Sequence, residues 1–244
     1  MRLLEGIRVT RHFGGLCALL DVDFYIDQGD IVALIGPNGA GKTTLFNVIT
    51  GTFPPTFGTI KFEGKNITDS KAYEICRLGI ARTFQVPKPF PNMTVYENIL
   101  SASIFGGDKN KPTSDIKSKI DEILEKYGLA KKGATLASNL AVFEQRMLEI
   151  ARALATKPKL LLLDEVMAGL NPKETMQITD NIQGLRKDGT TIFIIEHNMR
   201  AVMGLSHRVI VLNQGMKIAD GKPEEIGKDT KVIEAYLGKA YVGD

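Results

Sequence analysis

One nine-residue stretch constrains this chain more than any other, because it matches the pattern G-x-x-x-x-G-K-[ST] at every fixed position. In this chain the stretch reads Gly36, Pro37, Asn38, Gly39, Ala40, Gly41, Lys42, Thr43 and Thr44. Glycines let the backbone turn tightly and point its N–H groups inward, and a following helix N-terminus adds partial positive charge. The pattern predicts that Lys42 reaches the β- and γ-phosphates of a nucleotide and that the Thr43 hydroxyl binds Mg²⁺.

The sequence around this loop has the order that a phosphate-binding loop needs. Residues 31–35 form a continuous apolar run, which is typical of a strand buried on both faces of a parallel sheet. After the loop, apolar residues recur at helical spacing through Ile49, and we expect Gly51 to cap that helix. Strand, loop and helix together disfavour the alternative of a glycine-rich turn without a ligand.

Composition is typical of a water-soluble globular protein with a substantial core. The chain has 244 residues, of which 43% are hydrophobic, and a formal net charge of +3. No window approaches the roughly 18 to 20 apolar residues of a membrane span, and the N-terminus is unlike a signal peptide, so we expect a cytoplasmic location. Lysine and arginine are scattered, which argues against nucleic acid as a partner. Cys17 and Cys76 lack metal-ligand spacing and are expected to be free thiols.

The apolar patterns predict an α/β fold interrupted by a helical insertion. Strands are expected before the loop at residues 3–10 and 22–26, and after it at residues 58–66 and 80–84. Core strands return late in the chain, at residues 160–163, 191–195 and 209–212. Helical spacing occurs at residues 71–78, 94–105, 115–127, 144–156 and 173–186. Residues 106–114 are rich in glycine and polar residues, so we expect an exposed loop there.

A second motif supplies two acids at the end of an apolar strand. Four leucines, residues 160–163, are followed directly by Asp164 and Glu165. Ligands bind at the carboxyl ends of parallel strands. In this Walker B arrangement Asp164 would hold Mg²⁺ through its water shell, and Glu165 would polarise the attacking water. The alternative, two surface acids, is disfavoured by the phosphate-binding loop about 120 residues earlier.

One histidine follows a third apolar strand. Residues 191–195 end at Glu196 and His197, so His197 is expected at the same sheet edge, close to a γ-phosphate. The other two histidines, His12 and His207, are expected to be structural or exposed, as single histidines usually are.

Taken in order, these motifs resemble the nucleotide-binding subunits of ATP-binding cassette transporters. The resemblance covers nearly the whole chain and includes Gln85 and residues 168–171. It implies a P-loop NTPase core of the RecA type with an antiparallel β subdomain, formed by residues 1–86 and 156–244. It also implies an inserted helical subdomain, residues 87–155.

The same resemblance assigns further roles. Phe13 would stack on adenine, which a flat aromatic ring does well. Gln85 would touch Mg²⁺ or water and link the core to the helical subdomain. Residues 168–171 would form the D-loop, which crosses between two subunits. Several segments, including 82–85 and 195–199, are similar to the branched-chain amino acid importer subtype, and residues 235–238 to the larger of its two ATPase subunits.

The resemblance implies ATP and Mg²⁺ as ligands and a set of protein partners. These are membrane permease subunits, a second cassette ATPase in a homodimer or heterodimer and, indirectly, a periplasmic or extracellular substrate-binding protein. Lys42, Glu165 and His197 would be catalytic. The protein would lie on the inner face of the cell membrane.

The chain departs from the family in its signature segment, which would contact the partner's ATP. The segment consists of Leu140, Ala141, Val142, Phe143 and Glu144, and Phe143 stands where the family has a glycine. That glycine lets backbone N–H groups approach the γ-phosphate. Either Phe143 blocks this approach, or its ring turns away and the backbone still closes; we expect impairment. In a heterodimer, this predicts that the two ATP sites differ in function, because this chain's own phosphate-binding site would still work with a partner's intact signature.

Two other functions remain open at this stage. A soluble cassette ATPase that acts on nucleic acid or ribosomes usually has two cassettes or long coiled-coil insertions, and neither fits this length. A regulatory subunit that binds ATP only to dimerise, with weak hydrolysis, is compatible with Phe143. A Glu165→Gln substitution separates this alternative from an ATPase motor.

Overall fold

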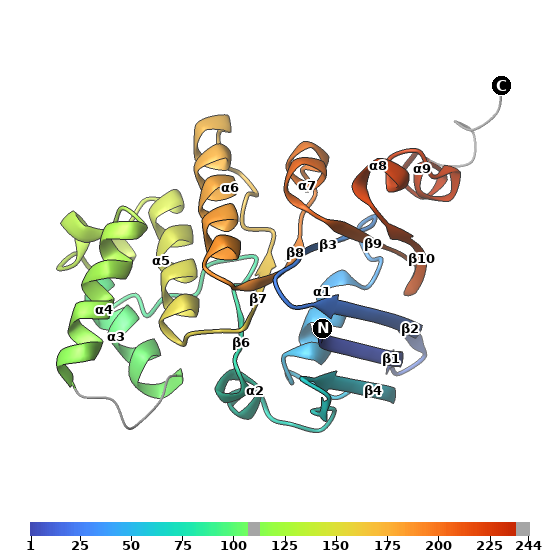
Figure 1. The fold of residues 1–244 in the computed structure, drawn as a ribbon, viewed down its shortest axis with the longest axis horizontal. Helices are drawn as coiled ribbons and strands as arrows, with labels where there is room; N and C mark the ends of the chain where they lie inside the picture. The colour runs from blue at the N-terminus through green and yellow to red at the C-terminus, as the bar shows by residue number, and fades with distance from the viewer. Residues whose placement is uncertain (107–112, 238–244) are drawn as a thin grey trace.

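A computed structural model describes residues 1–106 and 113–237 of the chain, drawn in Figure 1. The exposed loop that the sequence predicts at residues 106–114 falls mostly outside the described residues. At its two ends the prediction is wrong, because Gly106 belongs to one helix and the next helix already begins at Thr113. No helix among the described residues has both the length and the apolar composition needed to cross a membrane.

Six strands form a mostly parallel sheet through the middle of the molecule. Neighbouring strands follow the order β10, β9, β3, β8, β7, β6, and only β10 runs antiparallel to its neighbour. Their bounds are β3 Ile31–Ile35, β6 Ile80–Arg82, β7 Leu160–Asp164, β8 Thr191–Ile195, β9 Arg208–Asn213 and β10 Met216–Gly221. The sequence predicted all of these except β10, although β6 ends two residues earlier than expected.

The side chains of this sheet alternate between two hydrophobic clusters. In β3, Ile31, Ala33 and Ile35 face one cluster, while Val32 and Leu34 face the other. This alternation is the period of two that a β-strand imposes. All five residues of β3, β7 and β8 are buried, as expected for parallel strands covered on both faces.

A smaller antiparallel sheet lies beside the parallel one, as the sequence predicted. Its strand order is β2, β1, β4, β5, with bounds β1 Arg2–Phe13, β2 Leu16–Asp27, β4 Phe57–Phe62 and β5 Lys65–Asn66. One of the two hydrophobic clusters joins this sheet to the parallel one and encloses helix α1, Lys42–Ile49. Thr50 caps the end of α1, one residue before Gly51, which the sequence predicted as the cap.

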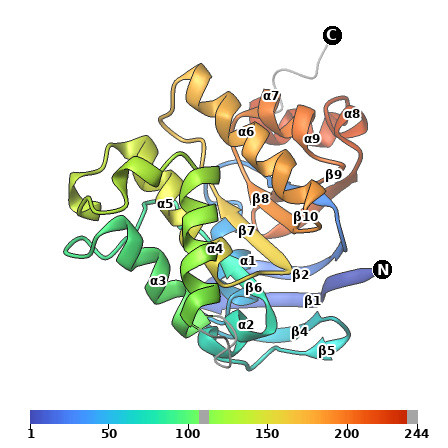
Figure 2. The ribbon, with the colours of Figure 1, turned by 60° about the vertical axis from the view of Figure 1, so that its left-hand side comes forward.

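The other face of the parallel sheet is covered by helices (Figures 1 and 2). Three of them, α3 Val95–Gly106, α4 Thr113–Lys126 and α5 Val142–Ala155, lie together at one side and share that face's cluster. The remaining helices are α2 Ala72–Leu78, α6 Pro172–Lys187, α7 Met199–Leu205, α8 Pro223–Ile226 and α9 Thr230–Leu237, with short 3₁₀ turns at Ala130–Lys132 and Ala137–Asn139. Helix α5 starts two residues earlier than expected.

Candidate functional site

Four neighbouring strands of the parallel sheet end at one edge, and each is followed by a segment of the candidate site. In spatial order these strands are β3, β8, β7 and β6. They lead into the glycine loop, His197, the Asp164–Glu165 pair and Gln85 respectively. Because the strands are parallel, their carboxyl ends meet at the same edge. The topology therefore brings together motifs as distant in the sequence as Gly36 and His197.

The glycine loop has the backbone conformation that its sequence predicts. Gly36, Gly39 and Gly41 have φ values of 150°, 78° and 102°, in the region that favours glycine. No side chain caps the N-terminus of α1, so its N–H groups remain available for phosphate oxygens. The Lys42 ammonium donates to the carbonyls of Gly36 and Pro37 at 2.7 and 3.0 Å, and burial lowers its pKa.

A cavity of about 620 Å³ opens above this loop. It is lined by Phe13, Leu16, Cys17, Ala18, Asn38, Gly39, Ala40, Gly41, Lys42, Thr43, Thr44, Gln85, Glu165 and Gln214. Most of the predicted nucleotide-binding residues are in this set, although Gly36 and Pro37 do not line the cavity. Phe13, at the tip of β1, is 40% exposed, and the Arg11 guanidinium lies 4.6 Å from its ring centre. The chain has no motif that would have indicated Leu16, Ala18 or Gln214.

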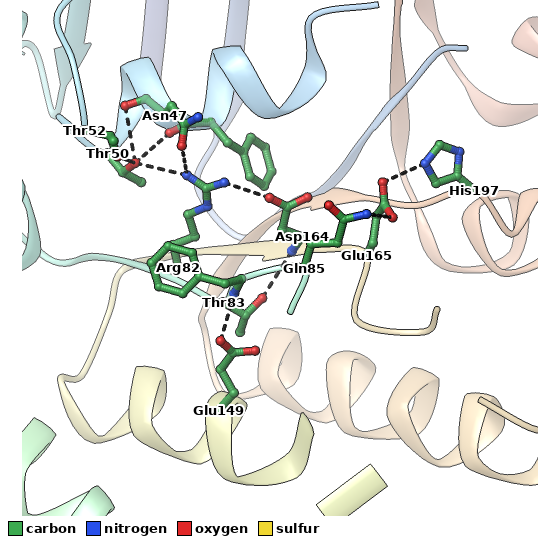
Figure 3. Close-up of polar contacts among 12 residues, drawn as sticks. Asn47, Thr50, Thr52, Arg82, Thr83, Gln85, Glu149, Asp164, Glu165 and His197 are labelled. Atoms are coloured by element: carbon green, nitrogen blue, oxygen red, sulfur yellow. Dashed lines mark hydrogen bonds and ion pairs between the residues drawn. The ribbon is translucent and has the colours of Figure 1, made fainter. Parts of the chain in front are cut away.

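Glu165 is held between the two other predicted contact residues. Its Oε2 accepts a hydrogen bond from Gln85 Nε2 at 2.8 Å, and its Oε1 lies 2.7 Å from His197 Nε2 (Figure 3). Glu165 also has a φ of 50°, which is uncommon outside glycine and concentrates at functional sites. The three side chains meet although they come from three different strand ends.

Asp164 is buried and has one unused oxygen. Its side chain is 1% exposed, and Oδ2 accepts a hydrogen bond from Arg82 Nη2 at 2.7 Å (Figure 3). Oδ1 has no partner among the described residues. Burial raises the pKa of Asp164, and the Arg82 hydrogen bond and charge oppose that shift. Sequence motifs gave no role to Arg82.

The residues at this edge fit Mg²⁺ bound together with a nucleotide. Mg²⁺ takes oxygen ligands and usually keeps waters and substrate phosphates in its shell, with few protein ligands. Thr43, Gln85 and Asp164 supply oxygens, and the buried unpartnered Oδ1 of Asp164 needs a donor such as a metal-bound water. No group of three or more His, Cys, Asp or Glu side chains at metal-binding distance occurs in the part of the chain that the structure describes.

Helix α5 clamps the backbone just before and at Gln85. The N–H of Phe84 donates to Glu149 Oε1 at 3.0 Å, and Arg146 donates to the carbonyls of Phe84 and Gln85. Arg146 and Glu149 are buried, and burial raises the pKa of Glu149. The sequence did not predict these contacts, because Arg146 and Glu149 both fit the helical pattern of α5 and nothing in that pattern indicates a contact with residues 84–85.

The residue before His197 makes a second hidden link. Glu196 is buried, and its Oε1 accepts the N–H of Met167 at 2.9 Å, directly before the predicted D-loop. Burial raises its pKa to about 7.

The remaining predicted residues near the site have structural contacts. Asn171, at the end of the predicted D-loop, caps α6 by accepting the N–H of Glu174. His12 and His207 are separate from the site; His207 Nδ1 accepts the N–H of Ile31.

The predicted signature segment lies apart from the cavity, at the start of α5. Leu140 is buried and Val142 is 62% exposed. The Phe143 ring is half-buried and packs against the hydrophobic cluster on the helix-covered face of the parallel sheet. Glu144 Oε2 accepts the N–H of Ala141 at 3.0 Å. None of the segment's five residues lines the cavity.

Comparison with family models identifies the chain. Residues 19–168 match the ABC transporter model, and residues 216–242 match the branched-chain amino acid ATP-binding cassette transporter model. This chain belongs to the ABC transporter family. The first match spans from β2 to just beyond the Asp164–Glu165 pair, so it includes both phosphate-site motifs.

Known relatives agree with this membership over the full length. The chain is 45% identical to the high-affinity branched-chain amino acid transport ATP-binding protein LivG of Salmonella typhimurium, across 98% of both chains. The ADP conformation of MJ1267, an ATP-binding cassette of an ABC transporter, superposes with a TM-score of 0.89 at 34% identity, over 98% of this chain and all of that one. The dimeric structure of the cassette MJ0796 superposes with a TM-score of 0.83 at 25% sequence identity, over 91% of this chain and 99% of that one. The predicted fold class is therefore confirmed.

Proposed function

We propose that this chain is the ATP-hydrolysing subunit of a membrane importer for branched-chain amino acids. One observation carries the proposal: Glu165 is held between Gln85 and His197, beside a cavity lined by the glycine loop. The full-length similarity to LivG supports the cargo. The chain would lie at the cytoplasmic face of the membrane, attached to permease subunits that receive solute from a binding protein.

The site's own groups can perform phosphoryl transfer by positioning and charge. The loop N–H groups and Lys42 would bind the phosphates, with the ammonium leaving the carbonyls that it now contacts. Glu165 would orient a water molecule and accept its proton, while His197 keeps that carboxylate in place. Mg²⁺, when bound by Thr43, Gln85 and Asp164, neutralises phosphate charge.

We further propose that a second cassette subunit completes the site. Phe13 and Leu16, which line the cavity, are exposed, and the signature segment at the start of α5 lies outside it. A signature supplied by a partner would close over the nucleotide, and the MJ0796 cassette, whose structure is dimeric, provides a precedent for the pairing of two cassettes. Each chain would then contribute one phosphate-binding surface and one signature surface.

The proposal can be tested by transport in proteoliposomes that contain this chain, its second cassette subunit and the permease. We expect leucine uptake that requires ATP on the cytoplasmic side. Glu165→Gln should lower hydrolysis by about 10²-fold or more, the usual contribution of a general base, while ATP binding is retained. Glu224→Gln, at an exposed acid of α8, is the matched control.

Three results would redirect the assignment. Unchanged turnover in Glu165→Gln would make the chain a regulatory subunit. A stable complex that forms without any permease would favour a soluble cassette ATPase. ATP-dependent uptake of amides or urea in place of leucine would retain the importer function and replace the cargo.

A further inference from the structure

Arg82 is a buried cation at the magnesium-binding edge of the sheet. Its side chain is only 7% exposed, and it is the last residue of β6, three positions before Gln85. The guanidinium donates to Asp164 Oδ2 at 2.7 Å and to Asn47 Oδ1 at 2.6 Å, with a longer contact of 3.4 Å to Thr50 (Figure 3). Rings of Phe46 and Phe84 lie within 6 Å of it.

These contacts join the two elements that would hold Mg²⁺. Asn47 is on α1, four residues after Thr43, so the two side chains lie on the same face of the helix, one turn apart. Asp164 ends β7. One guanidinium therefore spans from the helix that carries Thr43 to the strand that carries Asp164, and it sets how far apart the two lie.

The same contact fixes the orientation of the Asp164 carboxylate. The terminal torsion of an aspartate side chain is broad, so an unpartnered carboxylate rotates easily. In this site Arg82 occupies Oδ2, and the Asp164 backbone N–H donates to Thr83 Oγ1 at 3.1 Å. Oδ1 is left without a partner among the described residues and is the oxygen available to a metal-bound water.

We propose that Arg82 is the positioning residue of the magnesium site, acting through Asp164 and Asn47. The assignment rests on the proposed function, because it requires Mg-ATP at this edge. Arginine suits the role since its planar fork makes two directed hydrogen bonds at once, whereas a lysine ammonium acts as a point charge. Residues in this outer position typically change metal affinity 10- to 100-fold when substituted.

A purely structural role makes a different prediction. If Arg82 only balances the buried charge of Asp164, its loss weakens the fold and reduces nucleotide affinity equally with and without metal. A positioning role changes the metal-dependent part of nucleotide binding and leaves the metal-free part in place. The two roles therefore differ in the ratio of nucleotide affinities with and without metal, and this ratio can be measured without hydrolysis.

The test measures binding of a fluorescent ATP analogue to the full chain in EDTA and over a Mg²⁺ series. For Arg82→Gln we expect affinity in EDTA to change less than about twofold, while the Mg²⁺ concentration for half-maximal tightening rises about tenfold or more. Arg82→Lys and Asn47→Ala should give smaller rises in the same direction. Arg208→Gln is the matched control, since Arg208 forms a partly buried ion pair with Asp220 away from the site.

Electron paramagnetic resonance of Mn²⁺ with ATP supplies a second readout. Loss of the bound Mn²⁺ signal in Arg82→Gln, restored in part by Arg82→Lys, supports the assignment. In an Asp164→Asn background, Arg82→Gln should raise the Mg²⁺ requirement by less than it does in the parent chain, because only the contact with Asn47 is then left to lose.

Several outcomes overturn the assignment. An unchanged or lower Mg²⁺ requirement does so, as does an equal loss of affinity in EDTA and in Mg²⁺. If Arg82→Gln does not fold, Arg82→Lys and Asn47→Ala decide the question, and a normal Mg²⁺ dependence in both rejects it. If the unsubstituted chain shows no ATP binding, the proposed function fails instead.

Discussion

The two surfaces that this chain would offer to nucleotides are built in different ways. At the sheet edge, Gln85, the Asp164–Glu165 pair, His197 and the glycine loop follow four adjacent strands, and hydrogen bonds join Glu165 to both Gln85 and His197. The signature surface is the first turn of a single helix, where Val142 is exposed, Glu144 accepts the N–H of Ala141 and Gln145 donates to the Leu140 carbonyl. A site that depends on tight backbone geometry tolerates few substitutions, whereas an exposed helix start tolerates more.

The largest effect should come from breaking the backbone of the first surface. A Cβ at Gly41 would lie 2.6 Å from the Ala18 carbonyl oxygen and 2.9 Å from Leu19, with φ at 102°. Gly41→Ala should therefore cost about 3 kcal/mol of unfolding free energy, from strain and overpacking together. It should also weaken ATP binding more than about tenfold, because Gly41 caps α1 and sets the direction of its N–H groups.

The neighbouring Gly39 separates the two causes. Its φ is 78°, but a Cβ there would meet nothing within 4 Å. Gly39→Ala should cost only the left-handed backbone penalty, about 1 to 2 kcal/mol. Urea unfolding and ATP titration of both variants check this order, and equal losses would show that the close approach to Ala18 is unimportant.

A second effect, of similar size on stability and confined to pH above about 4.5, concerns Glu196, which links the first surface to the D-loop. Burial raises its pKa to about 7 from the ordinary 4.5, so the folded state favours the protonated form. Its destabilising effect is therefore fully present above pH 7 and disappears as pH falls from 7 to 4.5. The full effect is roughly 3 kcal/mol, from about 1.4 kcal/mol per pKa unit.

Glu196→Gln removes this titration while keeping an oxygen that accepts the N–H of Met167. We expect the variant to be more stable than the parent at pH 8 and to match it near pH 4.5. Unfolding free energies measured across this pH range check the sign. A variant that is less stable at pH 8 would mean that the ionised carboxylate stabilises the fold.

The sequence predicted those parts of the first surface whose signal is local. The glycine loop, the Asp164–Glu165 pair and His197 each follow a continuous apolar run, and strands that are buried on both faces are easily recognised. The links among them could not be predicted. Arg82 and Asp164 are 82 residues apart, and Phe84 and Glu149 are 65 apart, so only the packing of the folded chain shows that they meet.

The second surface shows the opposite limit of sequence reasoning. Its departure from the family pattern was plain from the position of Phe143, but the direction of the ring was not. In the structure the ring is half-buried against the hydrophobic cluster on the helix-covered face of the parallel sheet, which agrees with the alternative that the ring turns away from the helix start. We therefore propose that the backbone N–H groups of Val142 and Phe143 stay accessible to a partner's nucleotide, while that of Ala141 is bonded to Glu144.

The smallest effect on hydrolysis should accordingly come from Phe143→Gly. Removing the ring loses part of its packing, about 2 kcal/mol of stability, and Val142→Gly in the same turn reports the separate cost of a glycine. Hydrolysis by the assembled two-cassette complex should change less than about twofold, since a ring that packs inward obstructs nothing. A rise of tenfold would mean that the ring blocks the partner's nucleotide, and hydrolysis by the unsubstituted complex would then be confined to the site formed by this chain's own glycine loop. Hydrolysis measured in complexes with the catalytic Glu replaced by Gln in one subunit or the other would identify which of the two sites was inactive.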